Sequence, residues 1–499
     1  MNIIRRPLSG FFLKNHCLLK PQAFNGGSKT VGNSTLRSLT TCNLNFFNRN
    51  IANNASVNSI IRKQSLHTSS RTAFHRTAFC KNAPANGDIA TKIKSKYPVN
   101  SSNTVGYWLL GVSGLVFGIV ILGGLTRLTE SGLSITEWRP ITGSIPPLTH
   151  EDWVAEFEKY KESPEFKQLN SHITLDEYKF IFFMEWSHRL VARVIGLTLV
   201  LPAIYFAVRK KTSAHMNRRF IGLGLLLALQ GAVGWWMVYS GLDQKQLDDR
   251  KSKPTVSQYR LTTHLGAAFL LYMGMLWTSF EILKENSWIK SPEKAAQTIA
   301  KLESPLLKPF RRLSLFLVAL TFVTAMSGGM VAGLDAGLIY NTFPTMSNGG
   351  EQWFPNNNEL FSPVFARKED QSDMIWRNLF ENPTTVQLVH RILAISTFTT
   401  VFAAHMYVNR HKALLPKRAV QLMHYTMGMV TLQAALGIST LIYLVPIPLA
   451  AAHQAGAMGL LTLCLAFAAG LRKPRFPIRL LIRKLRAQLA QAKQGKILN

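Results

Sequence analysis

The chain has 499 residues, 47% of them apolar, and a formal net charge of +31. Such a charge would suit a nucleic-acid-binding protein, but the basic residues lie in an N-terminal region, in loops and in a tail, outside long apolar blocks. This distribution excludes nucleic acid as the partner and favours an integral membrane protein.

The N-terminal region has the composition of a targeting segment. No Asp or Glu occurs before Asp88, whereas Arg and Lys recur among Ser, Thr and Asn. Acid-poor, Arg- and Ser-rich N-termini are typical of organelle transit peptides, although a disordered basic tail is the alternative. We predict a transit peptide over 1–80, cleaved at roughly 60–85, and a matrix segment over 81–105. The cysteines offer no metal-spaced pair and no disulfide framework; they are Cys17, Cys42, Cys80 and Cys464.

Apolar residues then gather into blocks long enough to cross a bilayer, which takes about 20 apolar residues in a helix. The blocks cover 106–126, 179–208, 219–239, 261–282, 313–334, 385–408, 419–443 and 447–471. The sequence therefore predicts an all-α integral membrane protein with eight transmembrane helices.

The charges of the loops predict the orientation. Lys and Arg crowd the loops after the second, fourth and sixth blocks and the tail over 472–499, whereas loop 335–384 is rich in acid. By the positive-inside rule, both termini and the linker 283–312 face the matrix, and loops 127–178, 240–260 and 335–384 face the intermembrane space. Apolar residues among the basic ones favour an interfacial helix in the tail; a solvated tail is the alternative.

The chain is internally duplicated. Gly123-Gly124-Leu125 ends the first block and Gly328-Gly329-Met330 ends the fifth, and further matches follow in the same order. Each half crosses the membrane an even number of times. We therefore predict two tandem four-helix bundles, 106–282 and 313–471, related by a pseudo-twofold axis along the membrane normal.

Each block that runs toward the matrix carries one histidine within its first turns. These histidines are His188, His264, His390 and His453. An ionisable side chain inside a membrane span is a candidate functional residue by default, and four at repeat-equivalent positions and one depth favour metal or heme binding over hydrogen-bonded packing. Two imidazoles per half suit the axial ligands of a heme iron, whereas zinc or copper needs three or four converging ligands. We predict two heme sites.

Four arginines are candidate partners for heme propionates, because they lie near the histidines or on the covering loops. They are Arg127, Arg139, Arg189 and Arg391; snorkelling to the interface is their alternative role. The halves differ three residues before the first histidine of each, where Glu185 corresponds to Gln387. A carboxyl beside a heme can transfer protons, so Glu185 is the candidate catalytic residue. A purely structural pair with Arg189 is the alternative.

Two segments resemble the signatures of a known family, the heme A synthases. Gly123-Gly124-Leu125-Thr126-Arg127-Leu128-Thr129-Glu130-Ser131-Gly132-Leu133-Ser134, followed by Glu137-Trp138-Arg139-Pro140, resembles their first-helix signature. Glu185-Trp186-Ser187-His188-Arg189 resembles their second-helix motif. The resemblance covers 106–471, and the transit peptide implies the mitochondrial branch. Some bacterial relatives carry a cysteine pair in the loop after the first helix, which loop 127–178 lacks.

The resemblance implies an activity, a site and partners. The C8 methyl of heme O would be oxidised through an alcohol to a formyl group, giving heme A for cytochrome c oxidase and its assembly factors. The substrate heme would lie between His188 and His264, a heme B between His390 and His453, with Glu185 in catalysis. Heme O synthase would supply the substrate, and mitochondrial ferredoxin with its reductase the electrons. Membrane lipid surrounds the chain, and a homo-oligomer is possible.

Two other functions compete with this interpretation. A diheme cytochrome b-type electron carrier would also use paired histidines, but its hemes would lie at different depths to span the membrane. A transporter with parallel repeats would show broken helices, and Pro202 is the main interruption of a block.

Overall fold

The computed structural model describes residues 97–139, 142–250, 253–347 and 352–497. Every regular element within these ranges is a helix, as the sequence predicts. The predicted transit peptide and most of the predicted matrix segment lie outside the described residues.

Among the described residues, eight helices are long and apolar enough to cross a membrane, in agreement with the predicted number of spans. They are α2 (Asn103–Leu128), α4 (Leu175–Val208), α5 (Ala214–Leu242), α7 (Gln258–Lys290), α9 (Lys308–Gly333), α12 (Pro383–Arg410), α13 (Lys417–Ile442) and α14 (Ile447–Leu471). Each of these spans is a single helix, and α4 continues through Pro202. The broken helices that would favour a transporter therefore do not occur among them.

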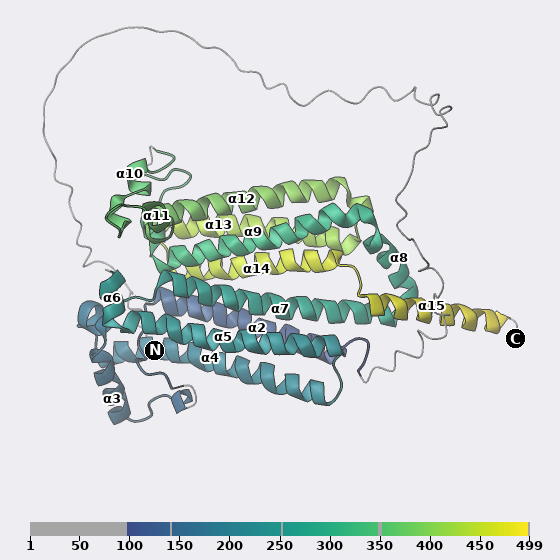
Figure 1. Ribbon diagram of the computed structural model, residues 1–499, viewed down its shortest axis with the longest axis horizontal. Helices are drawn as coiled ribbons and strands as arrows, with labels where there is room; N and C mark the ends of the chain where they lie inside the picture. Colours follow the sequence, from purple (N-terminus) through teal and green to yellow (C-terminus); the bar gives the residue numbers. More distant parts are fainter. Residues whose placement is uncertain (1–96, 140–141, 251–252, 348–351, 498–499) are drawn as a thin grey trace, which may run out of the picture. The chain divides into compact units, whose positions relative to one another are not determined.

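Shorter helices lie at the two ends of the spans (Figure 1). One end carries α3 (His150–Lys161), α6 (Gln244–Arg250), α10 (Asn357–Leu360) and α11 (Met374–Glu381). The other carries α8 (Pro292–Glu303) and α15 (Phe476–Ile497). We call these the α3 end and the α15 end. The loops that the positive-inside rule assigns to the intermembrane space all lie at the α3 end.

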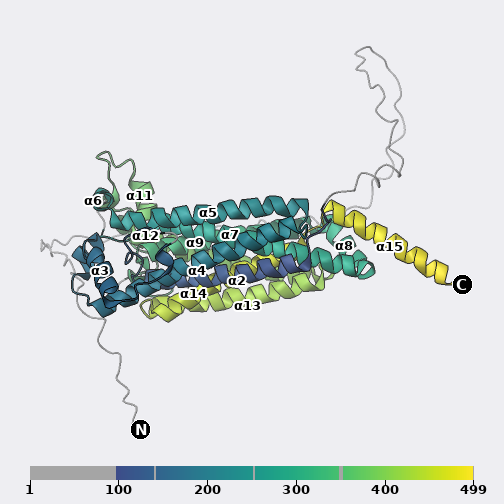
Figure 2. The same ribbon diagram turned by 90° about the horizontal axis from the view of Figure 1, so that it is seen from below.

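The two halves of the chain have the same pattern of neighbours. In the first half, α2 and α5 each pack against both α4 and α7; in the second, α9 and α13 each pack against both α12 and α14. The contact of α7 with α9 corresponds to that of α14 with α2, and α7 meets α14 between them. Figure 1 shows the halves side by side, and in Figure 2, which is seen from below, they overlap. This pattern supports the two-bundle interpretation, which stays a prediction.

The halves differ in the contact between their second and third spans. The helices α12 and α13 pack against each other along much of their length, whereas α4 and α5 share only a short contact. The inner spans α7 and α14 are the most buried of the eight, and the outer spans keep most of their surface for lipid.

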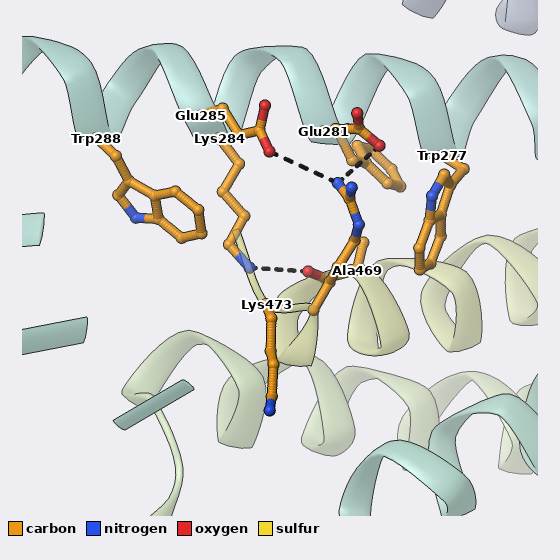
Figure 3. Close-up of a pocket in the computed structure, with 9 residues that line it drawn as sticks. Trp277, Glu281, Lys284, Glu285, Trp288, Ala469 and Lys473 are labelled. Carbon is orange, nitrogen blue, oxygen red and sulfur yellow. Dashed lines mark hydrogen bonds and ion pairs between the residues drawn. The ribbon is translucent and has the colours of Figure 1, made fainter. Parts of the chain in front are cut away.

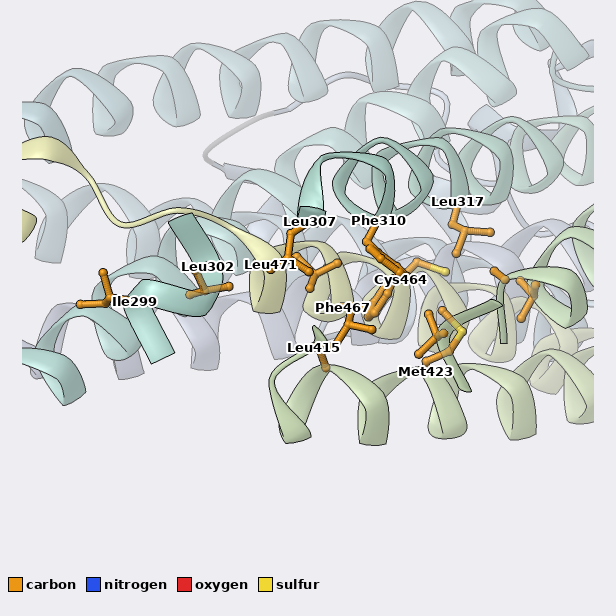
Figure 4. Packing of buried hydrophobic residues seen from close by; sticks show 14 of the residues in the cluster. Ile299, Leu302, Leu307, Phe310, Leu317, Leu415, Met423, Cys464, Phe467 and Leu471 are labelled. Atoms are coloured by element: carbon orange, nitrogen blue, oxygen red, sulfur yellow. The ribbon is translucent and has the colours of Figure 1, made fainter. Parts of the chain in front are cut away.

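The second half is held by an apolar cluster that reaches the α15 end (Figure 4). Leu317 of α9, Met423 of α13 and Phe467 of α14 are buried together there. Ile478 and Ile482 of α15 belong to the same cluster. The tail is thus helical, as one of the two alternatives predicts, but its first turns are held by protein contacts and its remainder extends away from the spans (Figure 1).

The helix α7 continues to Lys290, beyond the predicted block end at 282. Its last turns carry Glu281 and Glu285, whose side chains are buried. Arg472 Nη1 lies 2.7 Å from a Glu281 oxygen, and Arg475 Nε donates to Glu285 at 2.9 Å. Figure 3 shows Glu281 and Glu285 on the same helix as Lys284, which donates to the carbonyl of Ala469 in the last turn of α14. These contacts hold the polar extension in helical form.

Candidate functional site

Each of the four predicted histidines lies against a glycine of the preceding span. A Cβ built on that glycine would approach the imidazole Cε1 to 2.7–3.1 Å, so the ring would have to shift to admit a side chain. The pairs are Gly123 with His188, Gly234 with His264, Gly328 with His390 and Gly437 with His453. In the sequence, Gly123 and Gly328 mark the duplication and Gly123 also belongs to the family signature, but these patterns did not indicate a contact with histidine. Their role is to let one helix approach the imidazole closely.

The structure brings the histidines together in pairs within each half. His188 lies within electrostatic range of His264, and His390 within range of His453. All four helices start at the α3 end; His264, His390 and His453 lie within the first three turns, and His188 lies in the fourth turn, because α4 begins at Leu175, before the predicted block. From His264 to Glu281 along α7 is about 25 Å at 1.5 Å per residue, so the charged cluster of the α15 end belongs to a different region.

The Nδ1 atoms of the imidazoles have different partners in the two halves. If Nε2 binds an iron, Nδ1 is the outer nitrogen, which faces away from it. His390 Nδ1 lies 2.7 Å from Ser327 Oγ, and His453 Nδ1 lies 3.1 Å from Gln433 Nε2. The Nδ1 atoms of His188 and His264 are buried without a hydrogen-bond partner.

Glu185 is buried one turn before His188 and is held by three donors. Its Oε2 accepts from the Ser134 hydroxyl and from the Ile135 N–H, both at 2.8 Å, and its Oε1 accepts from Arg189 at 2.6 Å. The ion pair that the structural alternative requires is therefore present. The carboxylate also reaches the loop above it, through Ser134 of the first-helix signature.

The corresponding site in the second half lacks a charge. Gln387 Nε2 donates to the Tyr340 carbonyl at 3.0 Å, and Arg391 donates to the same carbonyl at 2.9 Å. Arg189 makes analogous bonds to the carbonyls of Glu137 and Ile135. Both arginines thus hold a covering loop onto the first turns of a span, in addition to any contact with a ligand.

The remaining two candidate arginines lie in different environments. Arg127 Nη2 lies 2.8 Å from Asp335 Oδ1, an ion pair between the two halves. Arg139 is about half exposed and pairs with Glu137. The buried Nε atoms of Arg127 and Arg391 have no hydrogen-bond partner. These two side chains therefore retain a donor for an anionic group.

The loop over the first half contains a buried polar network that sequence analysis missed. The Tyr160 hydroxyl donates to Glu165 Oε2 at 3.0 Å and accepts from Asn170 at 2.9 Å. Burial raises the pKa of Glu165 to about 8; the Tyr160 hydrogen bond opposes this rise, and the nearby charges of Glu185 and Glu130 add to it. Tyr160 also stacks on Tyr178 of α4, which fixes the loop above Glu185. No spacing in the sequence signals this contact.

The donor set fits heme better than a bare metal ion. Within the ranges that the structure describes, no three His, Cys, Asp or Glu side chains converge, and Cys464 is buried in the apolar cluster of the second half. A porphyrin brings its own equatorial nitrogens and needs only axial ligands from protein. Paired imidazoles, each lying against a glycine of the preceding span, meet that need.

Comparisons with known proteins agree on one family. A family model, COX15-CtaA, described as a cytochrome oxidase assembly protein, matches residues 106–465. Heme A synthase COX15 of Saccharomyces cerevisiae is 58% identical over 448 residues, which cover 89% of this chain and 91% of that protein. Heme A synthase COX15 of Homo sapiens is 45% identical over 362 residues, 72% of this chain and 81% of that protein. A heme A synthase–mitochondrial ferredoxin fusion protein of Schizosaccharomyces pombe is 50% identical over 389 residues, 77% of this chain and 62% of that protein.

Proposed function

The chain belongs to the COX15-CtaA family of cytochrome oxidase assembly proteins, and we propose that it makes heme A in the mitochondrial inner membrane by oxidising the C8 methyl of heme O to a formyl group. The observation that carries this proposal is the set of four histidine–glycine contacts at one end of the spans. In each half, two imidazoles would be available to hold a heme iron.

The substrate heme is assigned to the first half, between His188 and His264. A heme B is assigned to the second half, between His390 and His453. The assignment is supported by the buried carboxylate of Glu185, whose counterpart Gln387 cannot titrate. A site that removes hydrogen from a methyl carbon needs a group that can take up protons.

The residues of the first half have separate tasks. His188 and His264 hold the substrate, and the apolar spans around them exclude water. Glu185 is the group that takes up or releases a proton there, and the Ser134 hydroxyl, 2.8 Å away, orients its carboxylate by donating to Oε2. Arg189 keeps that carboxylate in place, and Arg127, Arg139 and Arg391 are proposed partners of propionates. The porphyrin iron supplies the redox chemistry that no side chain provides.

The orientation follows from the basic loops. With the α15 end in the matrix, both termini face the matrix and the histidines lie near the intermembrane space. The domain bounds stay as predicted from the sequence: bundles over 106–282 and 313–471, linked through 283–312, with a basic tail over 472–499.

The fusion relative of Schizosaccharomyces pombe supports ferredoxin as the electron donor, since its name joins the two proteins in one chain. Ferredoxin reductase would then reduce the oxidised ferredoxin again. Heme O synthase would deliver the substrate, and cytochrome c oxidase assembly factors would receive heme A. A homo-oligomer is compatible with the lipid-facing outer spans.

To test this function, the chain and its Glu185→Gln variant are expressed with a competent ferredoxin in a host that makes heme O. The hemes are then extracted and separated by chromatography. The parent should yield heme A, and the variant should keep heme B but accumulate heme O or an alcohol intermediate. Asp176→Asn, an exposed carboxylate of the same helix, is the matched control.

Other outcomes favour the competing functions. A parent that binds heme yet never makes heme A would be an electron carrier of the diheme cytochrome b type. A parent that purifies without heme would favour a transporter.

A further inference from the structure

The two halves differ at the imidazole nitrogen that faces away from a bound iron. Ser327 Oγ donates to the Thr324 carbonyl at 2.7 Å, so its hydroxyl hydrogen is already used. Its contact with His390 Nδ1, also 2.7 Å, must then be one in which the nitrogen donates. The proton of the neutral ring is thus on Nδ1, and the lone pair of Nε2 is free for a metal.

The first half has no such partner. The position that corresponds to Ser327, directly before the glycine that contacts the first histidine, is Leu122. An aliphatic side chain offers no acceptor, and His188 Nδ1 is buried without one. Nothing there fixes the ring to the tautomer that a metal requires.

The second histidines of the two halves do not repeat this difference. Gln433 Nε2 donates to the His453 carbonyl at 2.9 Å, and the corresponding Gln230 donates to the His264 carbonyl at 3.1 Å. Gln433 Nε2 also lies 3.1 Å from His453 Nδ1, but an amide nitrogen is a donor and cannot accept a proton from that atom. Of the four rings, only His390 therefore has an acceptor for an Nδ1 proton, and that acceptor is Ser327.

We propose that Ser327 is a positioning residue that makes the second half a permanent heme site, and that Leu122 allows the heme bound in the first half to exchange. A hydrogen bond to the outer nitrogen orients a ligating imidazole and raises its basicity, and its loss typically costs about 10–100-fold in metal affinity. A resident cofactor needs that retention. A heme that arrives as substrate and leaves as product needs its absence. This inference rests on the proposed function.

The first test removes the acceptor. Purified Ser327→Ala is mixed with excess apomyoglobin, and the transfer of heme B is followed by absorbance, with redox titration of the retained heme. We expect transfer about 10–100-fold faster than in the parent and a higher midpoint potential, because a less basic imidazole stabilises ferric iron less. Ser327→Thr should restore both values.

The matched control is Ser314→Ala. Ser314 lies on the same helix, is buried, and bonds only its own helix at the Arg311 carbonyl. It should match the parent in heme transfer and potential. Parent-like transfer and potential in Ser327→Ala would overturn the proposal.

A reciprocal variant keeps the proposal testable if Ser327→Ala fails to fold. Leu122→Ser should slow the release of heme O or heme A, which extraction and chromatography distinguish from heme B, and should leave heme B unchanged. Unchanged release would show that Leu122 does not set exchangeability. Both readouts follow bound heme rather than turnover, so a parent that binds two hemes without making heme A would refute the proposed function and still test Ser327.

Discussion

Gly123 of α2 lies so close to His188 of α4 that a methyl group added to it would stand 2.8 Å from the imidazole Cε1. Gly123→Ala should therefore displace the imidazole and lower heme O binding by about 100-fold, the cost of a misplacement near 1 Å. The span itself should fold at least as well, since Ala favours a helix over Gly by about 1 kcal/mol. Gly114→Ala, on the same helix with open space around it, is the control, and heme content per purified protein is the measurement.

The second half offers the same experiment on the other heme. A Cβ on Gly437 would stand 2.7 Å from His453 Cε1, whereas Gly428 of the same helix has no neighbour within 4 Å. Gly437→Ala should lose heme B while Gly428→Ala keeps it, as measured by the pyridine hemochrome spectrum. Equal heme B in both variants would show that the glycine is not needed by the ligand.

The ion pair of Arg127 and Asp335 joins the two halves, and its loss should weaken their association. Asp335 has φ 53°, a left-handed conformation that Asn tolerates, so Asp335→Asn removes the charge with little backbone strain. We expect Asp335→Asn to lower the free energy of unfolding by about 1 kcal/mol. The double variant with Arg127→Ala should lose less than the sum of the two single losses, because both substitutions remove the same ion pair. Thermal unfolding in detergent tests this. Lys161→Ala, from an exposed pair with Glu158, should have little effect.

Arg475 neutralises two buried carboxylates at the α15 end, with its Nε 3.1 Å from Glu281 Oε1 and 2.9 Å from Glu285 Oε2. Arg475→Ala would leave buried charge unpaired, which costs roughly 3–5 kcal/mol. The apparent melting temperature should fall sharply, and Arg483→Ala, an exposed basic residue of α15, should leave it unchanged. A parent-like melting curve for Arg475→Ala would mean that Arg219, which pairs with Glu281, and Arg472, which contacts both carboxylates, satisfy them without Arg475.

The loop over the first half should loosen as the pH rises. The pKa of Glu165 rises from an ordinary 4.5 to about 8 on folding, so the folded loop binds a proton more tightly than the unfolded one. Its stability is greatest below pH 4.5 and declines as the pH rises toward 8. Proteolysis within 150–174 should accelerate over this range in the parent. Glu165→Gln should abolish the pH dependence, and Glu162→Gln, at an exposed neighbour, should retain it.

The eight spans were predictable because an apolar block of sufficient length is a local signal. The end of α7 was not, because Glu281 and Glu285 continue the helix only where arginines from beyond α14 meet them. The end of the spans near which the histidines lie could be predicted from their place in each block, whereas their depth in the membrane stays a prediction. The glycine under each ring could not be recognised as a contact, since it lies on another helix.

For Glu185, the candidate catalytic residue, the sequence again predicts one part of the site and tertiary packing determines the rest. The difference between Glu185 and Gln387 is visible once the duplication is found. The hydroxyl of Ser134 and the N–H of Ile135, which hold the carboxylate, belong to a loop whose path over α4 depends on the stacking of Tyr160 on Tyr178. Such contacts are set by tertiary packing, which no periodicity in the sequence encodes.

The pairing of each histidine with a glycine of the preceding span has a consequence for assembly. Two consecutive helices, such as α13 and α14, already contain one imidazole and the surface on which it lies. The ligand-bearing unit is therefore a helical hairpin, which the membrane-insertion machinery can deliver as one piece. A porphyrin between two histidines would then crosslink two hairpins, so that cofactor supply and maturation of the bundle become a single coupled equilibrium.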